Sequence, residues 1–224
     1  MQKIGLKVKY ISTLLVVFSG VFFLTAGLLP VKNSRASYDS FVNTVNSQRQ
    51  VGNPNADVVV VVYSDFQCPW CRKLEIHDLS KIVKNYAVTG KILIEYRDFP
   101  LVYIHPYAFK AAEYADCSAL QGKYLLVRGL LYNYQDDWNV IGDIYYFLKT
   151  KAGNILNMQK EESCVKSGYS KRLIDSNIAR GKDIGVKGTP MLFIYKGLML
   201  YKTQKGYSPY PVIKSLIDGA LSGS

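Results

Sequence analysis

A run of five valines and a tyrosine, residues 58–63, constrains the fold of this chain more than any other stretch. A continuous β-branched run bounded by polar residues predicts a strand buried on both faces of a sheet, and therefore a central strand. Pro69 suits the first turn of a helix, and apolar residues then recur at helical spacing as far as Gly90. Cys68 and Cys71 thus lie where a central strand passes into a helix.

The elements that follow define the fold class. A second strand at 92–96 completes a β-α-β unit, and the chain from about 105 to 160 is helical almost throughout. A helix at about 170–183 precedes two short apolar runs, which are separated by a Lys-Gly pair and predict a tight hairpin. A last helix spans about 211–221. This order predicts an α/β protein, a thioredoxin fold with an inserted helical domain.

The composition divides the 224 residues into successive parts. We expect a signal peptide or membrane anchor at 1–36, a linker or loosely held leading helix at 37–50, the first part of the thioredoxin domain at 51–104, the helical insertion at 105–169 and the second part of the thioredoxin domain at 170–224. The chain is 49% hydrophobic, so it can bury a sizeable core and needs no metal or dense disulfide framework to fold. The cysteines are therefore available for chemistry.

The N-terminal segment predicts export. Three lysines precede an uncharged apolar stretch at 10–29, and Ser34, Arg35 and Ala36 place small residues at the spacing that a signal peptidase favours. The apolar length lies between that of a long signal peptide and that of a spanning helix, which needs ~20 residues. Cleavage and an uncleaved N-terminal membrane anchor both stay open. In either case we expect an extracytoplasmic location, in the periplasm or at the outer face of the cell membrane, where disulfides persist.

The charge of the chain argues against nucleic-acid binding. The formal net charge is +11, and five of these positive charges lie in residues 1–36 without any acid, which leaves +6 for the remainder. That remaining charge is scattered and forms no block of Lys and Arg. It suits solubility near an anionic membrane surface better than binding to DNA or RNA.

The cysteine pair has three interpretations, of which electron transfer between thiols is the strongest. At a helix N-terminus the free amides and the dipole stabilise a thiolate, which lowers a cysteine pKa to roughly 3.5–7.5. We therefore predict Cys68 as the solvent-facing nucleophile and Cys71, one turn deeper, as the shielded resolving thiol. A zinc site lacks a second CxxC and has only His77 and His105 to draw on. A purely structural Cys68–Cys71 bridge closes too short a loop to stabilise much.

Five stretches, taken together, resemble one known family. They are DFQCPWC, YRDFPL, HPYAFKAAEYADCSALQGKY, ESCVKSG and GVKGTP, and the resemblance extends from about Val51 to the C-terminus. The chain resembles the exported DsbA family of thiol:disulfide oxidoreductases, in the branch that includes BdbD-like proteins. The resemblance implies an enzyme that donates a disulfide to unfolded exported proteins, with no cofactor or metal beyond its redox-active cysteines. It also implies reoxidation by a quinone-linked membrane partner of the DsbB or vitamin K epoxide reductase (VKOR) type.

The resemblance also assigns roles to residues far from the CxxC. Thr189 and Pro190 correspond to the family's cis-proline position, whose backbone pairs with an extended substrate beside the active disulfide. Cys117 and Cys164 stand where this branch often has cysteines, which implies a structural disulfide.

Two departures from the family pattern concern the redox site. The best-studied oxidases have a histidine that stabilises the thiolate, whereas Pro69 is followed here by the uncharged Trp70, an indole that we expect to be exposed and to hold unfolded chains. Many relatives have an acid six residues before the nucleophile, where this chain has Val62. Asp65, which we count among the residues that shape the site, or Glu95 is a candidate to carry the proton instead. A solvated position at a strand end, without a role in proton transfer, fits both carboxylates better than a proton-carrying role does.

Two other functions stay open at this point. A reductase or isomerase uses the same two cysteines but depends on an electron donor that keeps them reduced. A non-catalytic chaperone or metal-binding module uses the same groove without turnover. His105 has two interpretations as well, a packing residue at a helix start or a polar group near the redox site.

Overall fold

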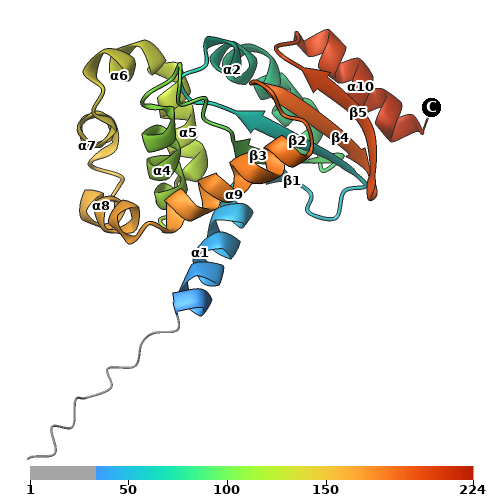
Figure 1. The fold of residues 1–224 in the computed structure, drawn as a ribbon. Helices are drawn as coiled ribbons and strands as arrows, with labels where there is room; N and C mark the ends of the chain where they lie inside the picture. Colours follow the sequence, from blue (N-terminus) through green and yellow to red (C-terminus); the bar gives the residue numbers. More distant parts are fainter. Residues whose placement is uncertain (1–33, 224) are drawn as a thin grey trace, which may run out of the picture.

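The computed structural model describes residues 34–223, in which helices surround a five-stranded sheet (Figure 1). The expected signal peptide or membrane anchor at 1–36 lies outside the described residues except at its last positions. Within the described part of the chain, no helix is both long and apolar enough to cross a membrane.

Strand β2, Val58–Ser64, is the centre of the sheet, as its run of valines predicts. The strands lie in the order β1-β3-β2-β4-β5, with β3 (Ile92–Asp98) parallel to β2 and β4 (Met191–Lys196) antiparallel to it. β5 (Met199–Lys205) forms the predicted hairpin with β4. The edge strand β1 (Gln50–Gly52), which the sequence analysis missed, pairs antiparallel with β3.

One face of the sheet is covered by the helical segment that begins at the CxxC. It alternates between α and π geometry, as α2 Pro69–Lys73, η1 Leu74–Leu79, α3 Ser80–Ile82 and η2 Val83–Ala87. Helix α10, Tyr210–Ser222, packs beside it. The side chains of Val58, Val60 and Val62 are almost completely buried in this core, so burial fixes the position of β2 and of the turn that follows it.

Helix α9, Tyr169–Asp183, covers the other face. Gly181 of α9 lies so near the sheet that a Cβ there would be 2.8 Å from the ring of Phe99 and 3.1 Å from that of Tyr63. This close approach requires a glycine. Val59 and Val61 point toward this face and are only partly buried, so the prediction of a strand buried on both faces holds less well here.

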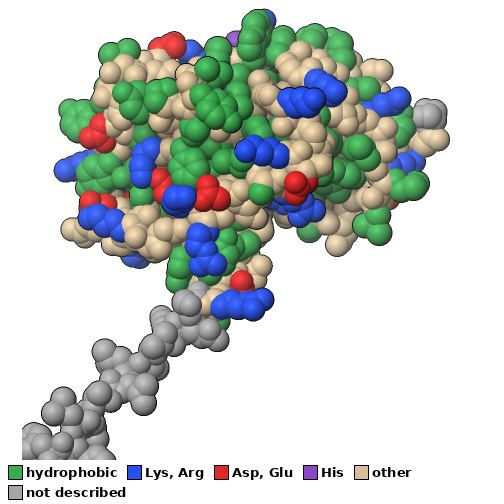
Figure 2. Space-filling model, viewed as in Figure 1, with side chains coloured by type: hydrophobic (Ala, Val, Ile, Leu, Met, Phe, Trp, Pro, Cys, Tyr) green, Lys and Arg blue, Asp and Glu red, His purple; other side chains and the backbone are tan. Residues whose placement is uncertain are grey.

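The helical insertion lies beside the sheet (Figure 1) and consists of α4 Ala108–Ala119, α5 Tyr124–Asn133, α6 Gln135–Ile141, α7 Ile144–Ala152 and α8 Met158–Ser167. Asp143 begins α7, where its side chain accepts the amide hydrogen of Tyr146 at 2.9 Å. Trp138 is fully buried and donates its indole N–H to the carbonyl of Leu131 at 2.7 Å. On the face that Figure 2 shows, basic, acidic and apolar side chains are interspersed rather than gathered into one basic patch.

The segment that we expected to be a linker or a loosely held helix is part of the folded unit. Helix α1, Ser34–Gln48, packs against α4 and α5, and its Phe41 side chain is buried in the core. Arg49 follows, completely buried, and forms ion pairs with Asp98 at the end of β3 and Asp116 of α4. The polar composition of the segment indicates a linker, whereas a few buried side chains hold it in place.

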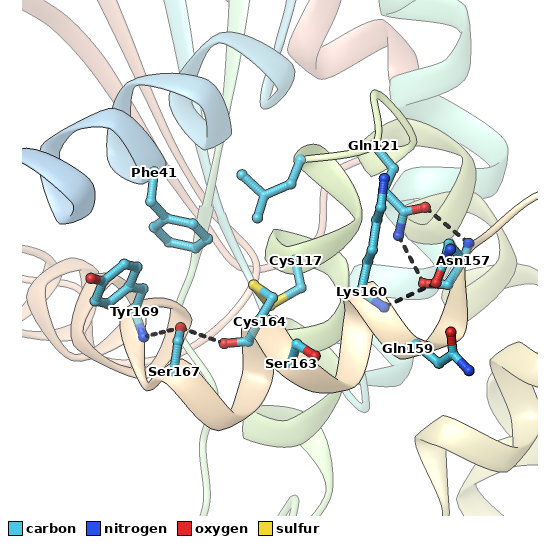
Figure 3. A pocket seen from close by; sticks show the side chains of 11 residues that line it. Phe41, Cys117, Gln121, Asn157, Gln159, Lys160, Ser163, Cys164, Ser167 and Tyr169 are labelled. Carbon is cyan, nitrogen blue, oxygen red and sulfur yellow. Dashed lines mark hydrogen bonds between the residues drawn. A yellow bond between two sulfur atoms is a disulfide. The ribbon is translucent and has the colours of Figure 1, made fainter. Parts of the chain in front are cut away.

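A disulfide joins α4 to α8 within the insertion. The structure bonds Cys117 to Cys164, with a sequence separation of 47 and Cα atoms 5.7 Å apart. Both cysteines border a cavity of about 590 Å³ that Phe41 and Tyr169 also line (Figure 3). None of the residues that line this cavity belongs to the CxxC segment.

Replacing both of these cysteines, as Cys117→Ala with Cys164→Ala, should lower the free energy of unfolding by about 4 kcal/mol, because the open chain regains the entropy of a long loop. Urea denaturation measures the loss. The matched control is Cys68→Ala with Cys71→Ala, because these two thiols are unbonded in this structure and close only a very short loop when oxidised, so their replacement should change the free energy of unfolding less. A loss below about 1 kcal/mol in the first variant would contradict this role of the disulfide.

Candidate active site

Cys68 occupies the position immediately before helix α2, with Pro69 as the first helical residue. The two thiols are not bonded to each other in this structure. Cys68 is 4% exposed and Cys71 is 2% exposed, so both are buried. The expectation that Cys68 faces solvent is therefore corrected, because the cis-proline loop and the helical insertion close over the start of the helix.

The two thiols differ in acidity. The thiol of Cys71 donates a hydrogen bond to the Cys68 sulfur, which lowers the pKa of Cys68 to about 6 although burial acts in the opposite direction. The backbone amides of Cys71 and Trp70 at the helix start act in the same sense as the thiol. Burial raises the pKa of Cys71 well above its ordinary value. A thiolate at Cys68 and a protonated thiol at Cys71 are thus the natural charge state near neutral pH.

The Thr189–Pro190 peptide bond is cis, and the loop that contains it lies against the redox pair. The Sγ atom of Cys68 is 3.4 Å from the carbonyl oxygen of Thr189, which accepts a hydrogen bond from Cys68 when that thiol is protonated. Pro190 itself is buried and leads directly into β4. The structure therefore brings Cys68, Cys71, Thr189 and Pro190 together at one end of the sheet.

Trp70 is 55% exposed beside this site. Its ring lies 5.8 Å from that of Tyr207 between centroids, and the Nζ atom of Lys73 lies 4.5 Å from the Tyr207 centroid. Trp70, Tyr207, Thr189 and Gly206 line a recess, called here the aromatic recess. Tyr207 had no signal in the sequence, because it is 137 positions away from Trp70 along the chain.

Asp65 is buried at the end of β2, which corrects the expectation of a solvated carboxylate. One oxygen accepts the amide hydrogens of Gln67 at 2.7 Å and Cys68 at 3.2 Å. The other accepts the amide hydrogen of Leu101 at 2.7 Å and lies 2.8 Å from Nδ1 of His105. His105 is therefore a polar group near the redox site, one of its two interpretations. Asp65 ties the active-site loop to the loop at 101–105.

Glu95, the other carboxylate considered for proton transfer, belongs to a different part of the sheet. It pairs with Arg97 at 2.7 Å and accepts a hydrogen bond from Gln50 at 3.0 Å, and it stands opposite Val61 in the register of β2 and β3. Among the residues that the structure describes, no group of three or more His, Cys, Asp or Glu side chains is arranged to hold a metal ion.

The helical insertion also holds the active-site loop. Gln135, at the start of α6, is buried and donates its side-chain amide to the carbonyls of Phe66 at 2.6 Å and Cys68 at 3.2 Å. Gln67 donates to the side chain of Asn139 in the same helix at 3.0 Å. No sequence pattern predicts these contacts, because they join residues about seventy positions apart.

The fold and the site together define a class, the thioredoxin-fold proteins in which two cysteines at a helix start face a cis-proline loop. Residues 44–206 match the family described as Thioredoxin, and the chain belongs to that family. The predicted fold class is confirmed by this match and by the solved structures that resemble the chain.

The solved structures include DsbA-type proteins. αDsbA1 from Wolbachia pipientis has a TM-score of 0.67 at 22% identity, with 78% of this chain and 91% of that chain covered. BdbD from Bacillus subtilis has a TM-score of 0.57 at 15% identity, with 79% and 94% covered. The resemblance to DsbA-type and BdbD-like proteins that the motifs predicted is thereby confirmed at the level of the fold.

Two curated relatives differ in length. The chain is 21% identical over 185 residues to "Probable disulfide bond formation protein D" of Bacillus anthracis, with 80% of this chain and 85% of that protein covered. It is 31% identical over 201 residues to "Na(+)/H(+) antiporter NhaA 3" of Salinispora tropica, with 86% of this chain but 29% of that protein covered. The chain therefore spans less than a third of the length of such antiporters.

The pH dependence of Cys68 tests the role of the Cys71 hydrogen bond. Thiolate absorbance of the reduced protein should titrate with a midpoint at about pH 6. Cys71→Ala removes the donor and should move the midpoint upward, whereas Cys71→Ser keeps a donor and should move it less. A midpoint that stays at about pH 6 in both variants would show that the backbone amides and the Thr189 side chain set the acidity of Cys68 without the Cys71 thiol.

Asp65→Asn should destabilise the oxidised protein by about 2 kcal/mol, because the new amide group must point its hydrogens at backbone N–H groups that now donate to the carboxylate. Urea unfolding at neutral pH measures this loss. His105→Ala removes one contact and spares the three amide contacts, so it should cost less. Equal stability of Asp65→Asn and the unmodified protein would mean that the buried carboxylate does not hold the loop.

Proposed function

We propose that the protein is an extracytoplasmic thiol:disulfide oxidoreductase that introduces disulfide bonds into exported proteins. The observation that carries this proposal is the placement of Cys68 at the start of helix α2, against the Thr189 carbonyl, with Cys71 buried one turn further along. This placement lowers the pKa of Cys68 and raises that of Cys71. A stabilised Cys68 thiolate is a good leaving group, which favours the dithiol over the disulfide and makes the disulfide an oxidant. The DsbA-type fold and the relative named as a probable disulfide bond formation protein support the same reaction.

The reaction balances without a cofactor. A substrate thiolate attacks the Cys68 sulfur of the Cys68–Cys71 disulfide, and Cys71 leaves with the electron pair and takes up a proton. The second substrate thiolate then attacks the substrate sulfur of the mixed disulfide and releases Cys68 as a thiolate. The substrate has lost two electrons and the protein has gained them. The proposal therefore includes an oxidant, a quinone-linked membrane protein of the DsbB or VKOR type, which restores the Cys68–Cys71 disulfide.

The export signal that the sequence predicts at 1–36 supports an extracytoplasmic location, either as a cleaved signal peptide or as an anchor. Unfolded exported chains are the proposed substrates, and the exposed indole of Trp70 offers them an apolar contact next to Cys68.

The reductase or isomerase alternative has one observation in its favour, the uncharged side chain of Trp70 between the cysteines. A Cys68 pKa of about 6 lies between the roughly 3.5 of the strongest oxidant of this kind and the roughly 7 of thioredoxin.

The direction of electron flow follows from linked equilibria of folding and proton binding. In the reduced protein, Cys68 is a thiolate above pH 6 when folded, whereas in the unfolded chain it stays protonated up to its ordinary pKa of 9.0. The free energy of unfolding of the reduced form should therefore rise, relative to the oxidised form, by about 1.4 kcal/mol per pH unit between these values. This added stability of the reduced form is lost as the pH falls through 6. Urea unfolding of both forms at several pH values measures the difference.

The same measurement decides between oxidase and reductase. For an oxidase, the reduced form is the more stable one at neutral pH, and the Cys68–Cys71 couple has a potential between about −120 mV and about −270 mV. Oxidised protein should then form disulfides in a reduced unfolded substrate without an added electron donor. A more stable oxidised form, with a potential at or below about −270 mV, would replace the oxidase proposal by the reductase alternative.

A further inference from the structure

A second recess borders the cis-proline loop next to the active site. It has a volume of about 180 Å³ and is lined by Gly185, Lys187, Gly188, Thr189, Met191, Lys205 and Gly206. Thr189 and Gly206 line the aromatic recess as well, so the two recesses share part of their walls. The carbonyl of Thr189 is also the group that accepts the hydrogen bond of Cys68. Both recesses therefore adjoin the residue that contacts Cys68.

The second recess carries positive charge only. Lys187 and Lys205 are exposed, and no acidic residue is among the side chains that line it. Neither lysine forms an ion pair with any carboxylate in the described range 34–223. The nearest acid along the chain, Asp183, does not line the recess. The lysine ammonium groups thus remain available to a ligand.

The backbone fixes both lysines relative to the cysteines. Lys205 stands opposite Met191 in the register of β4 and β5, and the amide of Gly206 donates to the carbonyl of Pro190 at 2.9 Å. Lys187 lies two positions before Thr189 in the cis-proline loop itself. The positive recess is therefore formed by the loop that contacts Cys68 and the end of β5.

We propose that Lys187 and Lys205 form a carboxylate subsite, so that the protein reacts preferentially with substrate cysteines that have an aspartate or glutamate nearby in the chain. This specificity rests on the proposed function. The contact takes no part in the bond changes of the thiol–disulfide exchange given above. It raises the rate of productive encounter and orients the substrate thiolate toward the Cys68 sulfur. Exposed charge pairs are individually weak, and two of them together correspond to about a fivefold preference.

The test uses the oxidised full chain and short peptides that contain two cysteines. One series has a glutamate at each successive position within three residues of the first cysteine, and a matched series has glutamine there. Disulfide formation in the peptide is followed by mass spectrometry after acid quench. We expect glutamate to accelerate the reaction about fivefold over glutamine at one or two positions at low ionic strength, and the advantage to shrink at about 1 M salt.

The double variant Lys187→Gln with Lys205→Gln should remove the preference for glutamate, so that the glutamate and glutamine peptides react at the same rate. Lys202→Gln is the matched control, because Lys202 is an exposed lysine of the same strand β5 that does not line the recess. This control should keep the full preference. A double variant that still prefers glutamate overturns the subsite.

Two further outcomes separate the subsite from the proposed function. If the double variant slows both peptide series equally, the lysines act on the substrate thiolate and not on a carboxylate, and the subsite is wrong while the oxidase stands. If glutamate and glutamine peptides react equally with the unmodified protein, the subsite is wrong as well. If no peptide of either series is oxidised, the proposed function itself fails.

Discussion

The buried carboxylate of Asp65 is the contact on which the geometry of the dithiol site depends. It stands at the end of the central strand and accepts hydrogen bonds from the amides of Cys68 and Leu101 on its two oxygens. A carboxylate without such partners is costly to bury. The active-site loop and the loop at 101–105 are therefore stable in this arrangement only together. Asp65 thereby holds Cys68 in a fixed position relative to the end of β2.

The helical insertion is part of the redox site and not an appendage to it. The side-chain amide of Gln135 holds the active-site loop by hydrogen bonds to two of its carbonyls. Arg128 of α5 is buried as well. It forms a two-point ion pair with Glu75 at 2.8 and 3.0 Å, and its guanidinium carbon lies 3.9 Å from the centroid of the Tyr96 ring. Glu75 belongs to the helical segment that begins at the CxxC. Changes in α5 or α6 therefore reach the cysteines through direct contacts.

The sequence predicted the parts of this structure that depend on local pattern. The central strand at the valine run, the helix start at the proline after Cys68 and the hairpin each depend on residues that are neighbours in the sequence. The structure contains all three. The burial of Cys68 and Asp65 depends instead on loops and helices that return from distant parts of the chain. Helix α1 was expected as a linker because its composition is polar, and nothing local marks Arg49 as a buried residue. Such contacts follow only from the assembled fold.

Arg49 precedes both of its carboxylate partners, Asp98 and Asp116, along the chain. A chain that is synthesised or translocated from its N-terminus therefore presents the guanidinium before anything can neutralise it. Helix α1 also has no α4 to pack on until residue 119 has followed. A buried cation without counter-charges is unfavourable, so Arg49 and helix α1 stay in water until Asp98 and Asp116 have been made. Helix α1 is thus made before the elements on which it packs, and its docking requires that β3 and α4 have already formed.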